Sequence, residues 1–179
     1  MEITKSHYFK KGCFRMQVTF KGDPLEVKGT QPIVGEQAPD ATLTNRQGEE
    51  VKLSSFIGNQ PVVISVVPDV QTRTCELQTK RFSKELAEKD VVYLTVSRNT
   101  VDEFNQWNDE NDLDLTTLSD TKHEFGKAYG LGVDMGGDER LARSVFLVDP
   151  QGIIQYVQIV EEIADEPNYD ATLEAIDNL

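Results

Sequence analysis

The feature of the sequence that most constrains the fold is the uncharged run at residues 62–67 (VVISVV). Its β-branched residues are typical of a strand that is buried on both faces of a sheet. Pro68 ends the run, good helix formers dominate residues 75–89, and a second buried run follows at 91–97. Strand, helix and strand in this order predict an α/β fold with a mainly parallel central sheet.

Further elements are expected on both sides of this unit. Thr100 and Glu103 form a capping box, so a helix is predicted to begin at Thr100. Apolar residues alternate in two segments before the unit and predict N-terminal hairpins. The remaining predicted elements are hairpins near 14–27, 41–53 and 144–160, a short helix at 122–129 and a last helix after Asn168. This order is that of a thioredoxin-like fold with N-terminal β-hairpin additions.

The length of 179 residues predicts one domain at 16–179, preceded by an N-terminal extension at 1–15. The formal net charge of −13 disfavours nucleic acid and anionic membrane surfaces as partners. No stretch has the roughly 20 apolar residues of a membrane helix, and the N-terminus lacks the apolar core of a signal peptide. Two cysteines are too few for a secreted disulfide scaffold. A cytoplasmic protein is therefore expected.

Cys75 lies where the first buried strand gives way to the helix, and this is the end of an α/β sheet at which chemistry gathers. Unpaired N–H groups and the helix dipole favour a thiolate in the first turn of a helix. Dithiol oxidoreductases carry Cys-x-x-Cys at such a site, but Thr72 occupies the first position here. The expected oxidant is therefore a peroxide rather than a disulfide.

Two further side chains complete the predicted catalytic site. Thr72 can donate its hydroxyl proton to the thiolate or accept a hydrogen bond from a peroxide. Arg143, at the entrance to a strand, is the predicted donor to the departing oxygen, with Arg140 as the substitute. Pro68 is expected to support the packing of the site.

Each of these residues also has a purely structural interpretation. Cys75 could be a small buried hydrophobe, Thr72 a helix N-cap, and Arg143 a surface cation on a sheet edge. His7 and His123 lack neighbours that would complete a metal site, and the glycines match no nucleotide-binding loop. No metal and no organic cofactor are predicted.

Pro68, Thr72 and Cys75 match the Pro-x-x-x-Thr-x-x-Cys motif of peroxiredoxins, and Arg143 matches the arginine of that family. The segments 17–28, 141–145 and 166–170 make the chain resemble the thiol peroxidase branch, the atypical two-cysteine peroxiredoxins. The resemblance implies that the Cys75 thiolate attacks hydrogen peroxide or an organic hydroperoxide and becomes a sulfenic acid. It also implies recycling by thioredoxin and a homodimer.

The sequence departs from this branch at the resolving cysteine, whose position aligns with Asn108. Resolution then needs Cys13, an external thiol or the cysteine of another subunit, although Cys13 is more simply interpreted as an incidental thiol. The missing cysteine motivates a second hypothesis, a peroxide-responsive redox sensor or binding module with little turnover. A third is a thioredoxin-like interaction domain in which Cys75 is inert.

Overall fold

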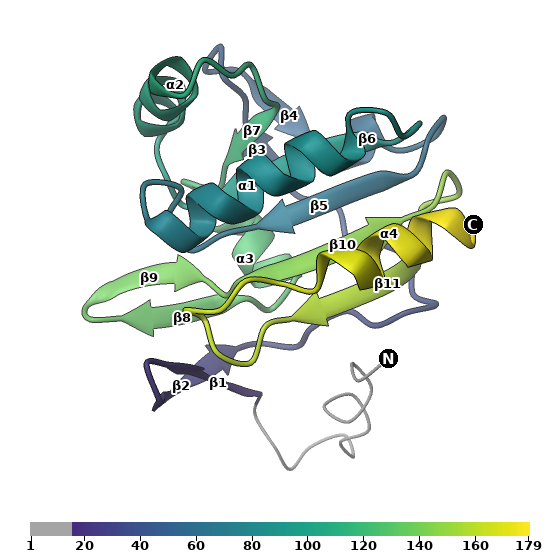
Figure 1. Ribbon diagram of the computed structural model, residues 1–179. Coiled ribbons are helices and arrows are strands. Elements are labelled where there is room, and N and C mark those ends of the chain that lie inside the picture. Colours follow the sequence, from purple (N-terminus) through teal and green to yellow (C-terminus); the bar gives the residue numbers. More distant parts are fainter. Residues whose placement is uncertain (1–15) are drawn as a thin grey trace.

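A mixed seven-stranded sheet forms the centre of the protein, in the order β11-β10-β5-β6-β7-β3-β4 (Figure 1). The computed structural model describes residues 16–179, so that the predicted extension, with His7 and Cys13, lies outside it. The strands of this sheet are β3 (Thr42–Thr44), β4 (Glu50–Lys52), β5 (Val62–Val66), β6 (Val92–Ser97), β7 (Thr117–Ser119), β10 (Ser144–Val148) and β11 (Ile154–Ile159).

The predicted α/β, thioredoxin-like fold is confirmed, but the expectation of a mainly parallel sheet is wrong. Only the pairs β5–β6 and β6–β7 are parallel. Strands β3 with β4, and β10 with β11, are hairpins whose short turns reverse the chain, so these pairs are antiparallel. The buried run that ends at Pro68 is the central strand β5, and all five of its residues are buried.

Alternate residues of β5 and β10 pack against different layers, as the two-residue period of a strand requires. Val63, Val145 and Leu147 face the helices α1 (Arg73–Leu86) and α4 (Tyr169–Asp177), which lie side by side in front of the sheet in Figure 1. The opposite face packs against α3 (Glu124–Ala128) and the N-terminal hairpin. The central sheet is therefore covered on both faces.

A second sheet of four strands, in the order β1-β2-β8-β9, contains the first N-terminal hairpin. Its strands are β1 (Gln17–Phe20), β2 (Asp23–Lys28), β8 (Gly132–Met135) and β9 (Asp138–Leu141). Strand β7 and the hairpin of β8 and β9 were not predicted from the sequence pattern. The turn of that hairpin is Gly136-Gly137, where both residues have the positive φ that favours glycine.

A loop after β11 holds the first hairpin in place. The Glu162 carboxylate accepts hydrogen bonds from the backbone of Gly22 at 2.9 Å and from the hydroxyl of Thr19 at 3.1 Å. The backbone N–H of Ile163 donates to the carbonyl of Thr19 at 2.8 Å. The first hairpin and this loop therefore support one another.

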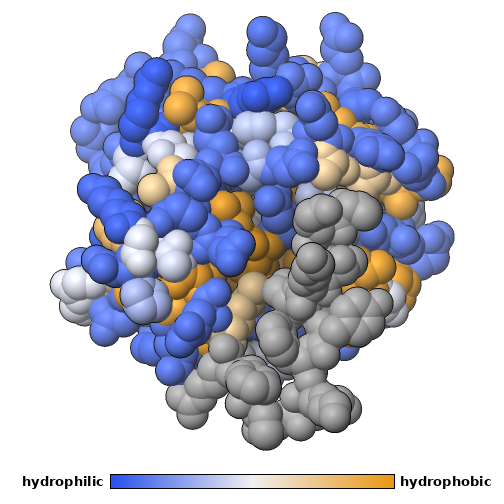
Figure 2. All heavy atoms as spheres, turned by 60° about the horizontal axis from the view of Figure 1, so that its bottom comes forward, coloured by the Kyte–Doolittle hydropathy of each residue, from blue (hydrophilic) through white to orange (hydrophobic). Residues whose placement is uncertain are grey.

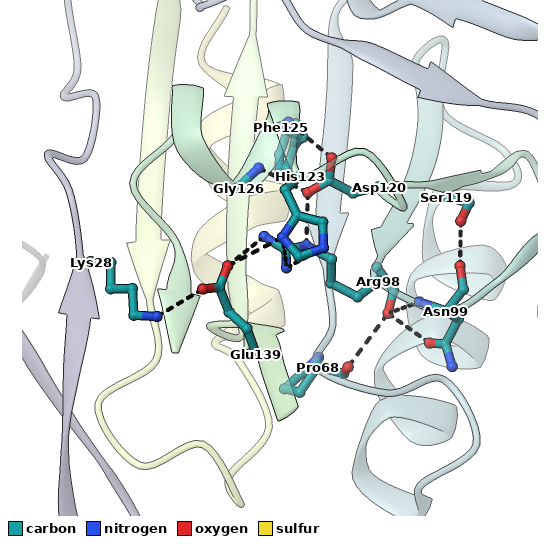
Figure 3. A network of polar contacts seen from close by, with 11 residues as sticks. Lys28, Pro68, Arg98, Asn99, Ser119, Asp120, His123, Phe125, Gly126 and Glu139 are labelled. Carbon is teal, nitrogen blue, oxygen red and sulfur yellow. Dashed lines mark hydrogen bonds and ion pairs between the residues drawn. The ribbon is translucent and has the colours of Figure 1, made fainter. Parts of the chain in front are cut away.

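A cluster of charged side chains joins the second sheet to the central one (Figure 3). Arg98, just after β6, contacts the carboxylate of Asp120 at 3.0 Å and that of Glu139 at 2.9 Å. Glu139 also pairs with Lys28 at 2.8 Å, and this hydrogen bond is the main cause that lowers the pKa of Glu139 to about 2. Asp120 is fully buried and accepts two backbone N–H groups at the start of α3.

The predicted helix positions are confirmed, with small shifts at the ends. The first helix begins two residues before Cys75, and α2 (Val101–Glu110) follows the predicted capping box of Thr100 and Glu103. The face of the molecule in Figure 2 is mainly hydrophilic, with hydrophobic side chains near its centre. Within residues 16–179, no helix is long and apolar enough to cross a membrane.

Candidate active site

The cysteine lies at the carboxyl end of the parallel strands, as predicted. Thr72 is the N-cap of α1, and Cys75 is the third residue of the helix. The Cys75 side chain is fully buried in an apolar cluster. It is the one cysteine within residues 16–179, and its thiol is free. The cluster comprises Val67, Val70, Cys75, Phe104 and Trp107, so α2 contributes its two aromatic residues to the cover over the thiol.

Asn99 holds the loop between β5 and α1. Its amide nitrogen donates to the Asp69 carboxylate at 2.9 Å, and its amide oxygen accepts from the backbone N–H of Val70 at 2.9 Å. The hydroxyl of Ser97 donates to the amide oxygen of Asn99 at 2.6 Å and lies 3.5 Å from the carbonyl oxygen of Pro68. Pro68 is itself buried. Residues at the end of β6 therefore fix the path of the chain that leads to Cys75.

Thr72 is exposed, and its hydroxyl donates to the carbonyl of Asp69 at 2.9 Å. It occupies the N-cap position without a side-chain capping bond. The predicted hydrogen bond from Thr72 to the sulfur is not among the contacts of residues 16–179. A rotation of the hydroxyl away from Asp69 is needed before it can donate to a thiolate or to a bound peroxide.

Arg143 is only 2% exposed, so the interpretation as a surface cation is excluded. It directly precedes Ser144, which pairs with Val66 at the carboxyl end of β5, and the register therefore brings it to the end of the sheet that carries Cys75. Its Nε donates to the carbonyl of Ile163 at 2.8 Å. Among the described residues, no carboxylate forms an ion pair with this buried guanidinium.

Gln78 is a site residue that the sequence analysis missed. Its amide oxygen accepts from Nη1 of Arg143 at 2.9 Å, and it lies one turn after Cys75 on the inner face of α1. Gln78 is fully buried. It therefore connects the arginine directly to the helix of the cysteine. The sequence pattern could have indicated it, because Gln78 is a polar residue on the same helix face as the apolar Phe82 and Leu86.

The other candidate residues do not belong to this constellation. Asn108 is buried, donates to the carbonyl of Phe104 at 3.0 Å and accepts from the backbone N–H of Leu115 at 3.0 Å. Arg140 lies in β9 near Asp138, and His123 packs against Arg98 in the charged cluster of Figure 3.

An open cavity of about 570 Å³ lies elsewhere in the molecule, with Gln37, Asp40, Ser54 and Pro150 in its wall. Val148 pairs with Val62 at the start of β5, so Pro150 lies at the amino end of the parallel strands. Cys75 follows the carboxyl end of β5. The cavity is therefore separate from the site.

A cysteine at a strand-to-helix junction of a thioredoxin-like sheet is typical of thiol oxidoreductases. The chain belongs to the AhpC/TSA family, whose model matches residues 34–157. It is 42% identical over 165 residues to a thiol peroxidase of Staphylococcus saprophyticus, and this alignment covers 91% of this chain and 99% of the relative. It is 37% identical over 162 residues to a thiol peroxidase of Bacillus subtilis, and this second alignment covers 89% of this chain and 95% of the relative.

Solved structures agree with this assignment. A peroxiredoxin-like protein from Aquifex aeolicus superposes with a TM-score of 0.83 at 29% identity, covering 90% of this chain and 96% of that one. A thiol peroxidase from Chromobacterium violaceum gives the same TM-score and coverage at 18% identity and supports the fold alone. The predicted membership of the peroxiredoxins, with relatives named thiol peroxidase, is confirmed.

Proposed function

We propose that this protein is a thiol peroxidase in which the Cys75 thiolate reduces hydrogen peroxide and organic hydroperoxides. The observation that carries the proposal is the connection from Cys75 through α1 and Gln78 to the buried Arg143. A permanently charged donor is thereby held beside the helix of the thiol. The relatives named thiol peroxidase support the same activity.

The first chemical step is attack by the sulfur on one oxygen of the hydroperoxide. The S–O bond forms as the O–O bond breaks, and the departing oxygen takes a proton and leaves as water or an alcohol. Cys75 becomes a sulfenic acid. Arg143 stabilises the negative charge on the departing oxygen, Thr72 orients the peroxide, and Pro68 supports the packing of the loop.

The second step needs a thiol from outside α2, because Asn108 stands where the resolving cysteine is expected. A first thiol displaces water from the sulfenic acid to form a mixed disulfide, and a second thiol releases Cys75 and leaves with the first as a disulfide. We propose thioredoxin or another cytoplasmic thiol as the reductant, with Cys13, in this chain or its partner, as the alternative first thiol. A homodimer is the expected assembly.

The replacement at Asn108 also motivates a second candidate function, a redox sensor or binding module in which oxidised Cys75 alters a partner contact. The two functions differ in turnover. Sustained peroxide consumption with thioredoxin, thioredoxin reductase and NADPH supports the enzyme. One oxidation per chain without recycling by any thiol would instead support the sensor.

Mass spectrometry after one equivalent of peroxide tests the site and the resolution step together. The proposal predicts oxidation of the intact chain and of Cys13→Ser, and none of Cys75→Ser. A disulfide between Cys13 and Cys75 would show resolution by the protein itself, whereas a persistent sulfenic acid would show dependence on an external thiol. Equal oxidation of Cys75→Ser would contradict the assignment of Cys75.

A further inference from the structure

A group of polar side chains lies beneath α1 in an otherwise apolar layer. Ser65 of β5 and Thr95 of β6 are paired in the parallel register and face the same side of the sheet. Tyr93 lies two residues before Thr95 and therefore shares this side. From the helix, Gln78 and Thr79 point into the same layer, and both are fully buried. Each polar atom in such a layer needs a partner.

The contacts fix the orientation of the Gln78 amide. A guanidinium can only donate, so the amide oxygen must face Arg143. The amide nitrogen then donates to the hydroxyl oxygen of Ser65 at 2.8 Å and, more distantly, to the carbonyl of Val66 at 3.4 Å. With the amide reversed, its nitrogen would face the donor Arg143 and its oxygen would face the carbonyl of Val66.

The proton of the Ser65 hydroxyl must point elsewhere, because its oxygen already accepts from Gln78. Tyr93 lies in the same layer, where its hydroxyl accepts from that of Thr95 at 3.2 Å. Burial raises the pKa of Tyr93 to about 12, while hydrogen bonds from Thr95 and Ser65 act in the opposite direction. Tyr93 is therefore protonated at neutral pH, and its hydroxyl donates to the carbonyl of Thr79 at 3.2 Å. Arg143 thus donates to Gln78 and Gln78 to Ser65, while Tyr93 in the same layer is tied to a backbone carbonyl of α1.

We propose that Ser65 and Tyr93 are positioning residues, which hold the Gln78 amide in the one orientation that accepts from Arg143. The inference rests on the proposed peroxidase function. Without the Ser65 hydroxyl, the amide nitrogen keeps only the distant carbonyl of Val66, and Gln78 can leave the orientation that fixes the guanidinium. Stabilisation of the departing oxygen requires a correctly directed Arg143 guanidinium, whereas the intrinsic reactivity of the thiol depends on that direction much less.

Single-turnover kinetics can test the proposal, with the fluorescence of Trp107 as the signal. Trp107 is the single tryptophan of the chain and packs in the same cluster as Cys75. The loss of one buried hydrogen bond predicts that Ser65→Ala slows oxidation by hydrogen peroxide about five- to tenfold, and Tyr93→Phe about two- to threefold. Alkylation by iodoacetamide, which has no departing peroxide oxygen, should stay within about twofold of the wild type in both variants.

Tyr156→Phe is the matched control. Tyr156 is also buried beneath the helices, and its hydroxyl interacts with Thr172 rather than with Gln78. This variant should oxidise at the wild-type rate, and Ser65→Thr, which keeps the hydroxyl, should recover most of the rate lost in Ser65→Ala.

Two outcomes would overturn the inference, and a third would overturn the function on which it rests. Equal slowing of oxidation and alkylation would reveal a purely structural role, and unchanged oxidation in both variants would remove any role. If Ser65→Ala fails to fold, the ratio of the two rates in Tyr93→Phe decides between these results. Absence of peroxide-dependent oxidation in the wild type would overturn the proposed function itself.

Discussion

Among residues 16–179, two buried arginines lie near the carboxyl ends of the parallel strands, and they differ in how their charge is balanced. Arg98 contacts two carboxylates, those of Asp120 and Glu139. Within the described part of the chain, Arg143 donates to neutral acceptors alone, the amide oxygen of Gln78 and the carbonyl of Ile163. Both side chains are nine-tenths or more buried, so the difference in charge balance does not come from solvent exposure.

This comparison separates structural from functional use of the same side chain. The charge of Arg98 is matched within the fold, and its contacts join the two sheets. The charge of Arg143 is held by dipoles alone and so remains able to stabilise an anion that arrives or forms nearby. The Arg98 cluster should therefore control stability, whereas Arg143 should control the rate of reaction with peroxide.

The largest expected effect is on stability, from Arg98→Ala. The substitution leaves the fully buried Asp120 carboxylate without its cation, which is expected to cost about 3–5 kcal/mol of unfolding free energy. Urea denaturation measures the loss, and Lys28→Ala, which removes an exposed partner of Glu139, should have a much smaller effect because solvent screens that pair. A loss below about 1 kcal/mol for Arg98→Ala would break the distinction between the two arginines.

The next effect is on rate, from Arg143→Ala. Peroxide attack should slow by about 100-fold or more, which is typical when a donor to a developing oxyanion is removed. Alkylation of Cys75 by iodoacetamide should change much less, because that reaction has no peroxide oxygen to stabilise. Stopped-flow measurement of both reactions checks this, with Arg140→Ala as a control of similar chemistry. Equal losses in both reactions would refute the role proposed for Arg143.

A smaller effect is expected from Thr72→Val, which keeps the shape of the side chain and removes its hydroxyl. Since one hydrogen bond to the reacting groups is lost, the rate of peroxide attack should fall about tenfold. Thr72→Ser keeps the hydroxyl and should stay near the wild type. An unchanged rate in Thr72→Val would limit the role of this residue to the helix cap and leave Arg143 as the main polar group of the reaction.

The smallest effect concerns acid and belongs to the Arg98 cluster. The pKa of Glu139 is lowered to about 2, chiefly by Lys28, from an ordinary value of about 4.3. Its stabilising contribution is therefore complete above the ordinary value and declines as the pH falls towards 2. Thermal unfolding between pH 6 and pH 3 should show a loss that Glu139→Gln lacks, by less than about 1 kcal/mol for this partly exposed pair. Identical pH profiles would contradict the assignment.

The sequence predicted the elements that local patterns encode. The fully buried β5, the capping box at Thr100 and the turn at 150–152 each depend on residues close together in the chain, and the structure confirms all three. The hairpin of β8 and β9 has short strands, and its pairing with β2 is a long-range contact. Such pairing leaves little local trace, so this second sheet was missed.

The candidate site divides in the same way. Cys75 and Thr72 could be placed because their position relative to a strand and a helix follows from the local sequence. That Arg143 is buried follows from the register of β10 against β5 and from the loop after β11, neither of which has a local pattern. Gln78 was missed because its role depends on a partner 65 residues away.

Asn108 has a consequence for the lifetime of oxidised Cys75. Its amide ties the last turn of α2 to Leu115, and α2 in turn supplies Phe104 and Trp107 to the cover over the sulfur. A small peroxide needs far less room to reach Cys75 than a protein thiol does. On the proposed mechanism, the cover formed by α2 therefore hinders repair of the sulfenic acid more than its further, irreversible oxidation by a second peroxide.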